Sequence, residues 1–239
     1  MHRHTAKTAL AVFTKIPGAA PVKTRLAAHG SLSQSHHLRL ATALMADTLL
    51  ACAEVQTERY IVSCPDTTLS ALEALCSSLP NPPSSETLKR FTMLTQIDGS
   101  FEERLNALLS DLADDGRAVV IVGSDTPTLS YGLLEHALAS CASGRFVLGP
   151  VGREGVYLIG IPAHAQDRRF AFTDEFTSRD QVGALMTSAR TFGWDTLLLE
   201  PLQDVDTMDD LIAVLTQQSI KSEKLNTYLC AVDAGLITI

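Results

Sequence analysis

Apolar and polar residues form alternating blocks along this chain, and the blocks predict strands and helices in turn. Short apolar runs predict buried strands at 9–13, 60–63, 91–95, 118–122, 146–150, 156–161 and 196–199. Apolar residues at helical spacing predict helices at 34–53, 68–78, 101–112, 131–143 and 182–192, and another after residue 207. In the helix at 101–112, the predicted apolar stripe consists of Phe101, Leu105, Leu108, Leu109 and Leu112. Strand and helix alternate as in βαβ units, which predicts an α/β protein with a largely parallel sheet. Two consecutive strands, near 146 and 156, predict that this sheet is mixed.

Three segments interrupt the alternation. Residues 14–26 hold three cations, two prolines and a glycine within eleven residues, which predicts a loop without a helix. Residues 163–181 are polar and poorly periodic, which indicates a flap or an insertion. The tail after residue 218 has the pattern of a terminal helix with a short extended end.

The composition is typical of one globular domain. The chain has 239 residues, of which 46% are hydrophobic, so we expect a single domain over 1–239 with a core at 9–215 and a tail at 219–239. A formal net charge of −8 argues against nucleic-acid binding, and no apolar run approaches the length of a membrane span. Five scattered cysteines without a CxxC pair, and an N-terminus without a signal-peptide core, predict a cytoplasmic protein.

The strand at 118–122 is the most informative segment, because it ends in Gly123-Ser124-Asp125. In open α/β sheets, ligands bind at the carboxyl ends of the strands. A carboxylate at that edge suits a hard metal ion with room for phosphate oxygens. The alternative is that Asp125 caps the helix that starts near Ser130.

Polar clusters follow three of the predicted strands, where strand ends should meet: Lys15, Lys23 and Arg25; Asp125; and Asp204 with Asp206. A phosphate ester with a bound divalent ion needs this mixture, because cations neutralise phosphate oxygens and carboxylates hold the metal. Each cluster also has a simpler interpretation. The cations can be a solvated loop face, and Asp204 or Asp206 can be a helix N-cap.

Other catalytic patterns are absent or weak. His36 and His37 are adjacent on a predicted helix and point apart, so a metal site made by them with His29 is not favoured. Ser124 lacks the G-x-S-x-G pattern of a hydrolase nucleophile, because residue 126 is Thr. The chain has no P-loop and no G-x-G-x-x-G motif after a strand.

Taken together, the polar clusters resemble the motifs of a bacterial family of proposed glycosyltransferases, also known as a domain of unknown function. That family has the nucleotide-diphospho-sugar transferase (GT-A-like) fold. The similar segments are F-x-K-x-P at 13–17, V-K-T-R-L at 22–26, G-S-D-x-P-x-L at 123–129, a partial match to G-P-A-x-D-G-G-Y-Y-L-I-G at 149–160, and D-V-D-T-x-x-D-L at 204–211. Their order and spacing agree over most of the chain.

The resemblance implies a Rossmann-like three-layer sandwich, a nucleotide or nucleotide-sugar bound over the first strand-to-helix loop, and transfer of the sugar to a small-molecule acceptor that the sequence does not identify. It implies that Asp125 and Asp206 hold Mg²⁺ or Mn²⁺, and that Lys23, Arg25 and Asp125 are catalytic. The substrate-binding residues that it implies are Phe13, Lys15, Lys23, Arg25, Gly123, Ser124, Arg153, Glu154 and Gly155. The K-T-R-L loop is also similar to that of guanylyltransferases, so a nucleotidyltransferase acting on a small phosphorylated substrate is the alternative reaction.

The chain departs from the family pattern where the sugar or acceptor is expected. Arg153 and Glu154 replace an acidic residue and a glycine, and the lost glycine removes backbone freedom at a point of close approach. Phe176 stands where the family has Trp. A changed substrate and a catalytically silent nucleotide-binding protein are therefore both open.

Overall fold

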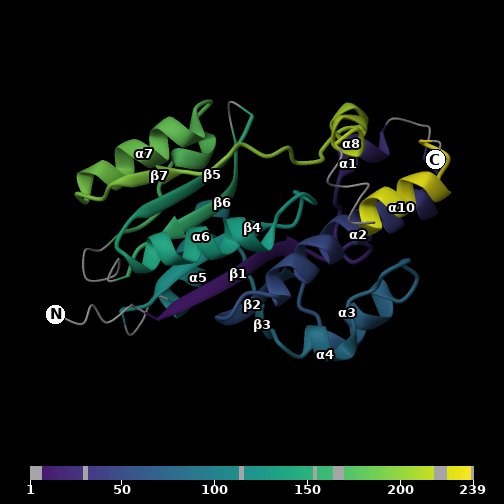
Figure 1. Ribbon diagram of the computed structural model, residues 1–239, viewed down its shortest axis with the longest axis horizontal. Helices are drawn as coiled ribbons and strands as arrows, with labels where there is room; N and C mark the ends of the chain where they lie inside the picture. Colours follow the sequence, from purple (N-terminus) through teal and green to yellow (C-terminus); the bar gives the residue numbers. More distant parts are fainter. Residues whose placement is uncertain are drawn as a thin grey trace.

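The computed structural model describes residues 7–28, 32–112, 116–152, 155–163, 170–217 and 225–237. Its centre is a seven-stranded sheet with the order β3-β2-β1-β4-β6-β5-β7 (Figure 1). The strands are β1 Thr8–Lys15, β2 Glu58–Cys64, β3 Thr92–Thr95, β4 Ala118–Gly123, β5 Phe146–Val151, β6 Gly155–Ile161 and β7 Thr196–Leu198. Only β6 runs antiparallel to its neighbours, β4 and β5. The prediction of a mixed, mainly parallel sheet is confirmed.

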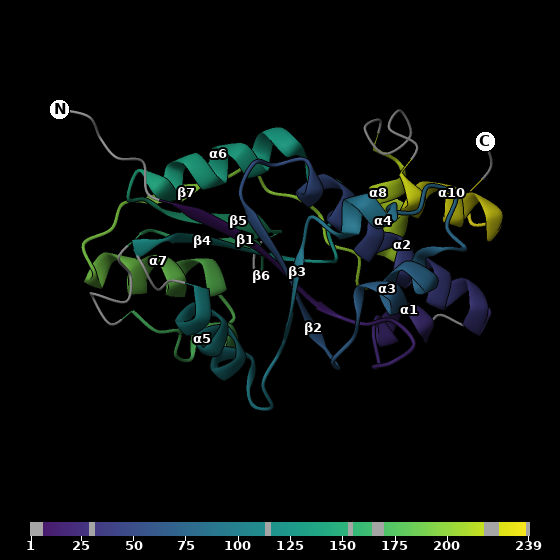
Figure 2. The same ribbon diagram turned by 90° about the horizontal axis from the view of Figure 1, so that it is seen from below.

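Helices cover both faces of the sheet, which gives the predicted three-layer sandwich (Figure 2). Alternate residues of β1 enter different cores, with Leu10 and Val12 in one cluster and Ala9 and Ala11 in the other. The helices that pack on the first cluster are α2 Gln34–Ala53, α3 Leu69–Cys76, α4 Ser85–Leu88, α6 Tyr131–Ala142, α8 Met208–Leu215 and α10 Asn226–Asp233. The second cluster is covered by α5 Phe101–Leu112 and α7 Gln181–Thr191.

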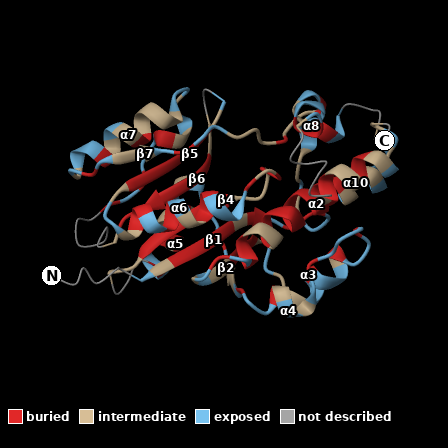
Figure 3. Ribbon diagram, viewed as in Figure 1, coloured by how far each residue is buried: buried red, intermediate tan, exposed pale blue. Residues whose placement is uncertain are grey.

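Buried positions are concentrated in the central strands and in α2 (Figure 3). The predicted bounds of α2 agree with the structure, and Ser33 is its N-cap, because the Ser33 hydroxyl accepts from the backbone N–H of His36. Within the described part of the chain, no helix is both long enough and apolar enough to cross a membrane.

Two predictions about irregular segments are wrong, and one helical turn was missed. One helical turn, α1 Thr24–Ala27, begins within residues 14–26, and its Leu26 is fully buried in the core. The turn α4, capped by Ser84, was not predicted. Part of the supposed flap at 163–181 belongs to the core: residues 170 and 172 are buried phenylalanines, followed by the short 3₁₀ helix η3 Glu175–Thr177. Residues 164–169 of that segment lie outside the described residues.

A buried carboxylate fastens the C-terminal helix α10 to α2. Asp47 is 3% exposed and accepts hydrogen bonds from the backbone N–H groups and the side chains of Asn226 and Thr227, at 2.7–3.0 Å. Burial raises the pKa of Asp47, and the four hydrogen bonds oppose that rise. The predicted terminal helix therefore forms, and a charge-assisted cap holds its first turn.

Gly149 allows β5 to lie against an aromatic ring. A Cβ atom at this position would be 2.3 Å from Cζ of Tyr157, far inside van der Waals contact. The Tyr157 hydroxyl donates to the Glu200 carbonyl at 3.0 Å, so moving the ring aside would break this hydrogen bond. This contact explains the glycine in the G-P motif at 149–150.

Candidate functional site

A cavity of about 860 Å³ lies where the parallel strands end. Phe13 of β1 pairs in register with Gly123 of β4, so both strands reach the cavity at the same level. Gly155 reaches it too, because β6 is reversed and begins at the edge where its neighbours end. The predicted site residues that line this cavity are Phe13, Lys15, Lys23, Arg25, Gly123, Ser124, Asp125, Gly155 and Asp206. Arg153 and Glu154 lie outside the described residues.

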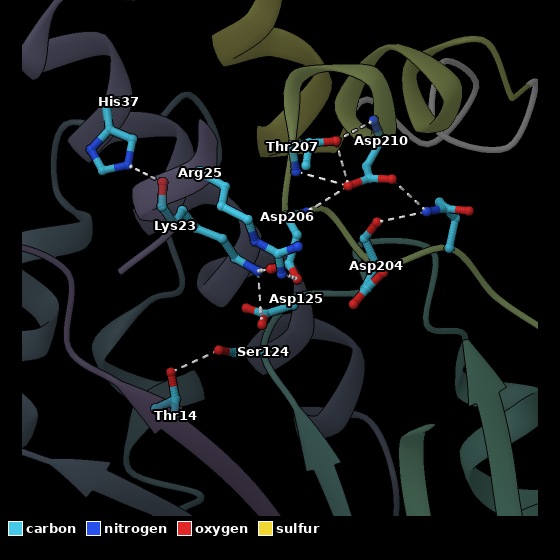
Figure 4. Close-up of polar contacts among 11 residues, drawn as sticks. Thr14, Lys23, Arg25, His37, Ser124, Asp125, Asp204, Asp206, Thr207 and Asp210 are labelled. Carbon is cyan, nitrogen blue, oxygen red and sulfur yellow. Dashed lines mark hydrogen bonds and ion pairs between the residues drawn. The ribbon is translucent and has the colours of Figure 1, made fainter. Parts of the chain in front are cut away.

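Lys23 is the centre of the charged end of the cavity (Figure 4). Its backbone is left-handed, with φ 49° and ψ 42°, which is uncommon for a residue other than glycine. Its side chain is 6% exposed, and Nζ lies 2.7 Å from Oδ2 of Asp125 and 2.9 Å from Oδ1 of Asp206. Nε2 of His37 lies 3.1 Å from the Lys23 carbonyl oxygen and supports this backbone. A strained residue held from several sides is a common feature of binding sites.

The structure contradicts the idea that Asp125 is a helix cap. The N-cap of α6 is Ser130, whose hydroxyl accepts from the N–H of Leu133. The Asp125 carboxylate instead faces Lys23, and its backbone carbonyl accepts from the N–H of Val205 at 2.9 Å. That bond brings the 204–206 segment beside the end of β4, although 80 residues separate them in sequence.

The N-cap interpretation of Asp204 and Asp206 is also wrong. Thr207 caps α8 and forms a capping box with Asp210. Asp206 is therefore available to pair with Lys23 and also with Arg25, whose side chain is 70% exposed (Figure 4).

Asp204 adds a third carboxyl to this end of the cavity. Burial, and next the negative charge of Asp206, raises the pKa of Asp204 to about 6, while Lys23 opposes the rise. A carboxyl that is partly protonated near neutral pH is typical of a functional site.

The aromatic end of the cavity was only partly predicted. It is lined by Gln96, Phe101, Arg104 and Phe176. Among these four residues, only Phe176, where the family pattern has Trp, was singled out in the sequence. Phe101 was expected in the apolar stripe of α5 with four leucines, but it is 40% exposed while all four leucines are buried. The available signal was its place at the start of the helix, next to the sheet edge.

Ser124 and Lys15, two further predicted residues, also lie at the cavity. The Ser124 hydroxyl lies 2.8 Å from the Thr14 hydroxyl and joins the ends of β4 and β1. Lys15 is exposed at the cavity, and no described carboxylate lies within ion-pair distance of it. His36 and His37 contribute to no metal cluster among the described residues, and His29 lies outside them.

Comparisons with known proteins agree with this fold. A family model described as uncharacterized protein conserved in bacteria (DUF2064) matches residues 48–179. No curated protein matches the chain. A "putative nucleotide-diphospho-sugar transferase" of Desulfovibrio desulfuricans G20 is similar in structure, with a TM-score of 0.76 and 23% identity over 97% of this chain and 96% of its own.

Two more distant structures have a TM-score of 0.50. One is a CMP:2-keto-3-deoxy-manno-octonic acid synthetase complexed with CTP, 10% identical over 92% of this chain and 100% of its own. The other is a manganese complex of Rv0371C from Mycobacterium tuberculosis H37Rv, 16% identical over 89% and 100%. At these identities the similarity establishes the fold, and the nucleotide-diphospho-sugar transferase architecture is confirmed.

Proposed function

The chain belongs to the bacterial family DUF2064, and we propose that it is a transferase that binds a nucleotide-sugar together with a divalent cation and passes the sugar to a small-molecule acceptor. The observation that carries the proposal is the Lys23 ammonium held between Asp125 and Asp206 inside the cavity. Cations and carboxylates that meet at the carboxyl edge of such a sheet suit a phosphate ester that brings a metal ion with it.

The donor atoms fit Mg²⁺ or Mn²⁺. One oxygen of Asp125 and one of Asp206 converge on a single positive charge, at 2.7 and 2.9 Å. Among the described residues, no three His, Cys, Asp or Glu side chains are grouped to hold a metal alone. Mg²⁺ is usually held by one or two carboxylates plus substrate phosphates, which is what Asp125, Asp206 and a diphosphate would provide. When bound, the cation supplies charge neutralisation of the leaving diphosphate.

Lys23 and Arg25 are the residues that bind the diphosphate. Lys23 offers a compact charge, and Arg25 offers a planar fork that matches phosphate oxygens. Both stabilise the negative charge that develops as the bond between the anomeric carbon and the diphosphate breaks. A cavity of about 860 Å³ lies within the size range of small-molecule sites.

Metal-dependent nucleotide binding is the first test. We expect nucleoside diphosphates or nucleotide-sugars with Mn²⁺ to raise the unfolding temperature by about 5–10 °C, because a ligand at about 100 times its Kd adds about 2.7 kcal/mol. Asp125→Asn should abolish this shift. Asp209→Asn, an exposed residue of α8 outside the cavity, is the matched control and should retain it. A full shift in the Asp125→Asn variant would refute the assignment.

Product analysis separates the alternatives. Glycosyl transfer, or slow donor hydrolysis, releases a nucleoside diphosphate from a nucleotide-sugar, whereas nucleotidyl transfer releases pyrophosphate from a nucleoside triphosphate. We expect the first product, and expect it to disappear in Lys23→Ala. Binding without either product, with a range of acceptors, would indicate the catalytically silent protein that the Arg153-Glu154 departure leaves open.

A further inference from the structure

The aromatic end of the cavity combines three phenylalanine rings with one arginine. Phe101 makes edge-on contacts with Phe13 and Phe176, with ring centroids 5.7 and 4.9 Å apart. The Arg104 guanidinium lies over the Phe101 ring, 5.7 Å from its centroid. All four side chains line the same cavity as Lys23 and Asp125. This end therefore offers flat apolar surface beside one fixed cation.

Hydrogen bonds to Gln96 and Ser100 hold Arg104 in position. Its Nη1 donates to Oε1 of Gln96 at 3.0 Å, and its Nε donates to the Ser100 carbonyl at 3.3 Å. Gln96 is itself 8% exposed, and its Nε2 donates to the Thr14 and Val62 carbonyls at 2.9 and 2.8 Å. The orientation of the guanidinium is thus fixed by the ends of β1 and β2.

Arg104 is oriented but its charge is not neutralised. Within the described ranges, no carboxylate lies within 4.0 Å of its guanidinium nitrogens. Two of the five N–H hydrogens of the guanidinium are used by Gln96 and Ser100, which leaves three for a ligand. A half-buried arginine kept in place without an acidic partner is prepared to donate to a bound molecule.

We propose that Arg104 determines the base of the nucleotide and selects guanine. This inference rests on the proposed nucleotide site and adds the chemical class of its base. The diphosphate is bound by Lys23 and Arg25 at the charged end, so the base occupies the aromatic end. Guanine presents two adjacent acceptors, O6 and N7, that match a guanidinium fork, whereas adenine places an amino donor beside N7.

The test measures the affinities of GDP, ADP, UDP and CDP by calorimetry in the presence of Mn²⁺. We expect the wild-type protein to prefer GDP over ADP by about 5- to 150-fold, the range typical of a two-pronged arginine contact. Arg104→Lys keeps the charge and loses the fork, so it should remove most of this preference while leaving the affinity for ADP unchanged. Arg190→Lys, on an exposed position of α7 outside the cavity, is the matched control and should bind as wild type does.

The outcomes are distinct. Tight binding of all four diphosphates without a preference for GDP overturns this inference and leaves the proposed function intact. An equal loss for all four in Arg104→Lys also overturns it, because it places the arginine on the phosphates or on another shared group. Failure of every diphosphate to bind the folded wild-type protein refutes the proposed function and this inference together.

Discussion

Replacing Lys23 by Met should strengthen metal binding by the protein without nucleotide. The ammonium contacts the two carboxylates that we assign to the metal, so an incoming cation must displace it. The carboxylates are 46% and 32% exposed, and partly exposed pairs of this kind contribute about 1 kcal/mol each. Two such pairs amount to about 2 kcal/mol, which corresponds to a roughly 30-fold higher Mn²⁺ affinity once the lysine is removed.

Calorimetric or electron-spin-resonance titration with Mn²⁺ at pH 8 measures this effect, with Asp204 ionised in most molecules. Lys15→Met is the matched control: it removes a cation from the same cavity, and no described carboxylate pairs with Lys15. The nucleotide should bind Lys23→Met more weakly, because the diphosphate loses a cation. An Mn²⁺ affinity equal to or below that of the wild type would refute the idea that the ammonium and the metal compete.

Three predictions concern stability. The pKa of Asp204 is raised from 3.8 to about 6, so the folded protein binds the proton of this carboxyl more tightly than the unfolded chain does. The stability that this bound proton contributes is therefore lost as pH rises from about 4 to 6. Asp204→Asn should therefore gain thermal stability relative to wild type over that range, and a constant difference would contradict this. In denaturant unfolding, Gly149→Ala should lower the free energy of unfolding by about 1–3 kcal/mol, because the added methyl group overpacks the core. Gly132→Ala, which has open space around its Cβ, should leave the free energy of unfolding nearly unchanged. Asp47→Asn should lower the free energy of unfolding by about 2–3 kcal/mol, because the new amide turns a donor toward the N–H groups in the first turn of α10. The exposed Asp233→Asn should lower it by less than about 1 kcal/mol. Equal losses would show that α10 is not held by the Asp47 carboxylate.

The sequence predicted the elements whose signals are local. The apolar strand at 118–122 is bounded by Gly116 and Gly123, and the helix at 34–53 has a serine cap and a long apolar pattern. Rules that use only residues close together in sequence therefore located both elements. Asp125 was found for the same reason, because a carboxylate directly after a buried strand must lie at the sheet edge. Its pairing with Lys23 followed from topology rather than from any contact visible in the sequence.

Competition between neighbouring residues was harder to predict. Asp204, Asp206 and Thr207 are all possible N-caps of α8, and backbone conformation decides among them: Thr207 is extended and bonds Asp210, which releases both aspartates to the cavity. Lys23 was predicted, but its left-handed backbone was not, because glycine is the usual signal for that conformation. Phe101 was misassigned because an exposed aromatic residue that continues an apolar stripe has the same pattern as a core residue.

Thr14, which the sequence analysis did not single out, contacts both ends of the cavity: its side-chain hydroxyl reaches the charged end, and its backbone carbonyl reaches the aromatic end. Its hydroxyl lies 2.8 Å from that of Ser124, beside Asp125, and its carbonyl accepts from Gln96, which holds Arg104. Thr14→Val removes the hydroxyl and keeps the carbonyl, so metal-dependent nucleotide binding should weaken by about 2- to 10-fold, the value of one hydrogen bond, while the ratio of GDP to ADP affinity stays constant. Thr14→Ser retains the hydroxyl and should bind as wild type does. A fall in the GDP to ADP ratio in Thr14→Val would mean that the two ends are not positioned independently, because base selection would then depend on the hydroxyl contact at the metal end.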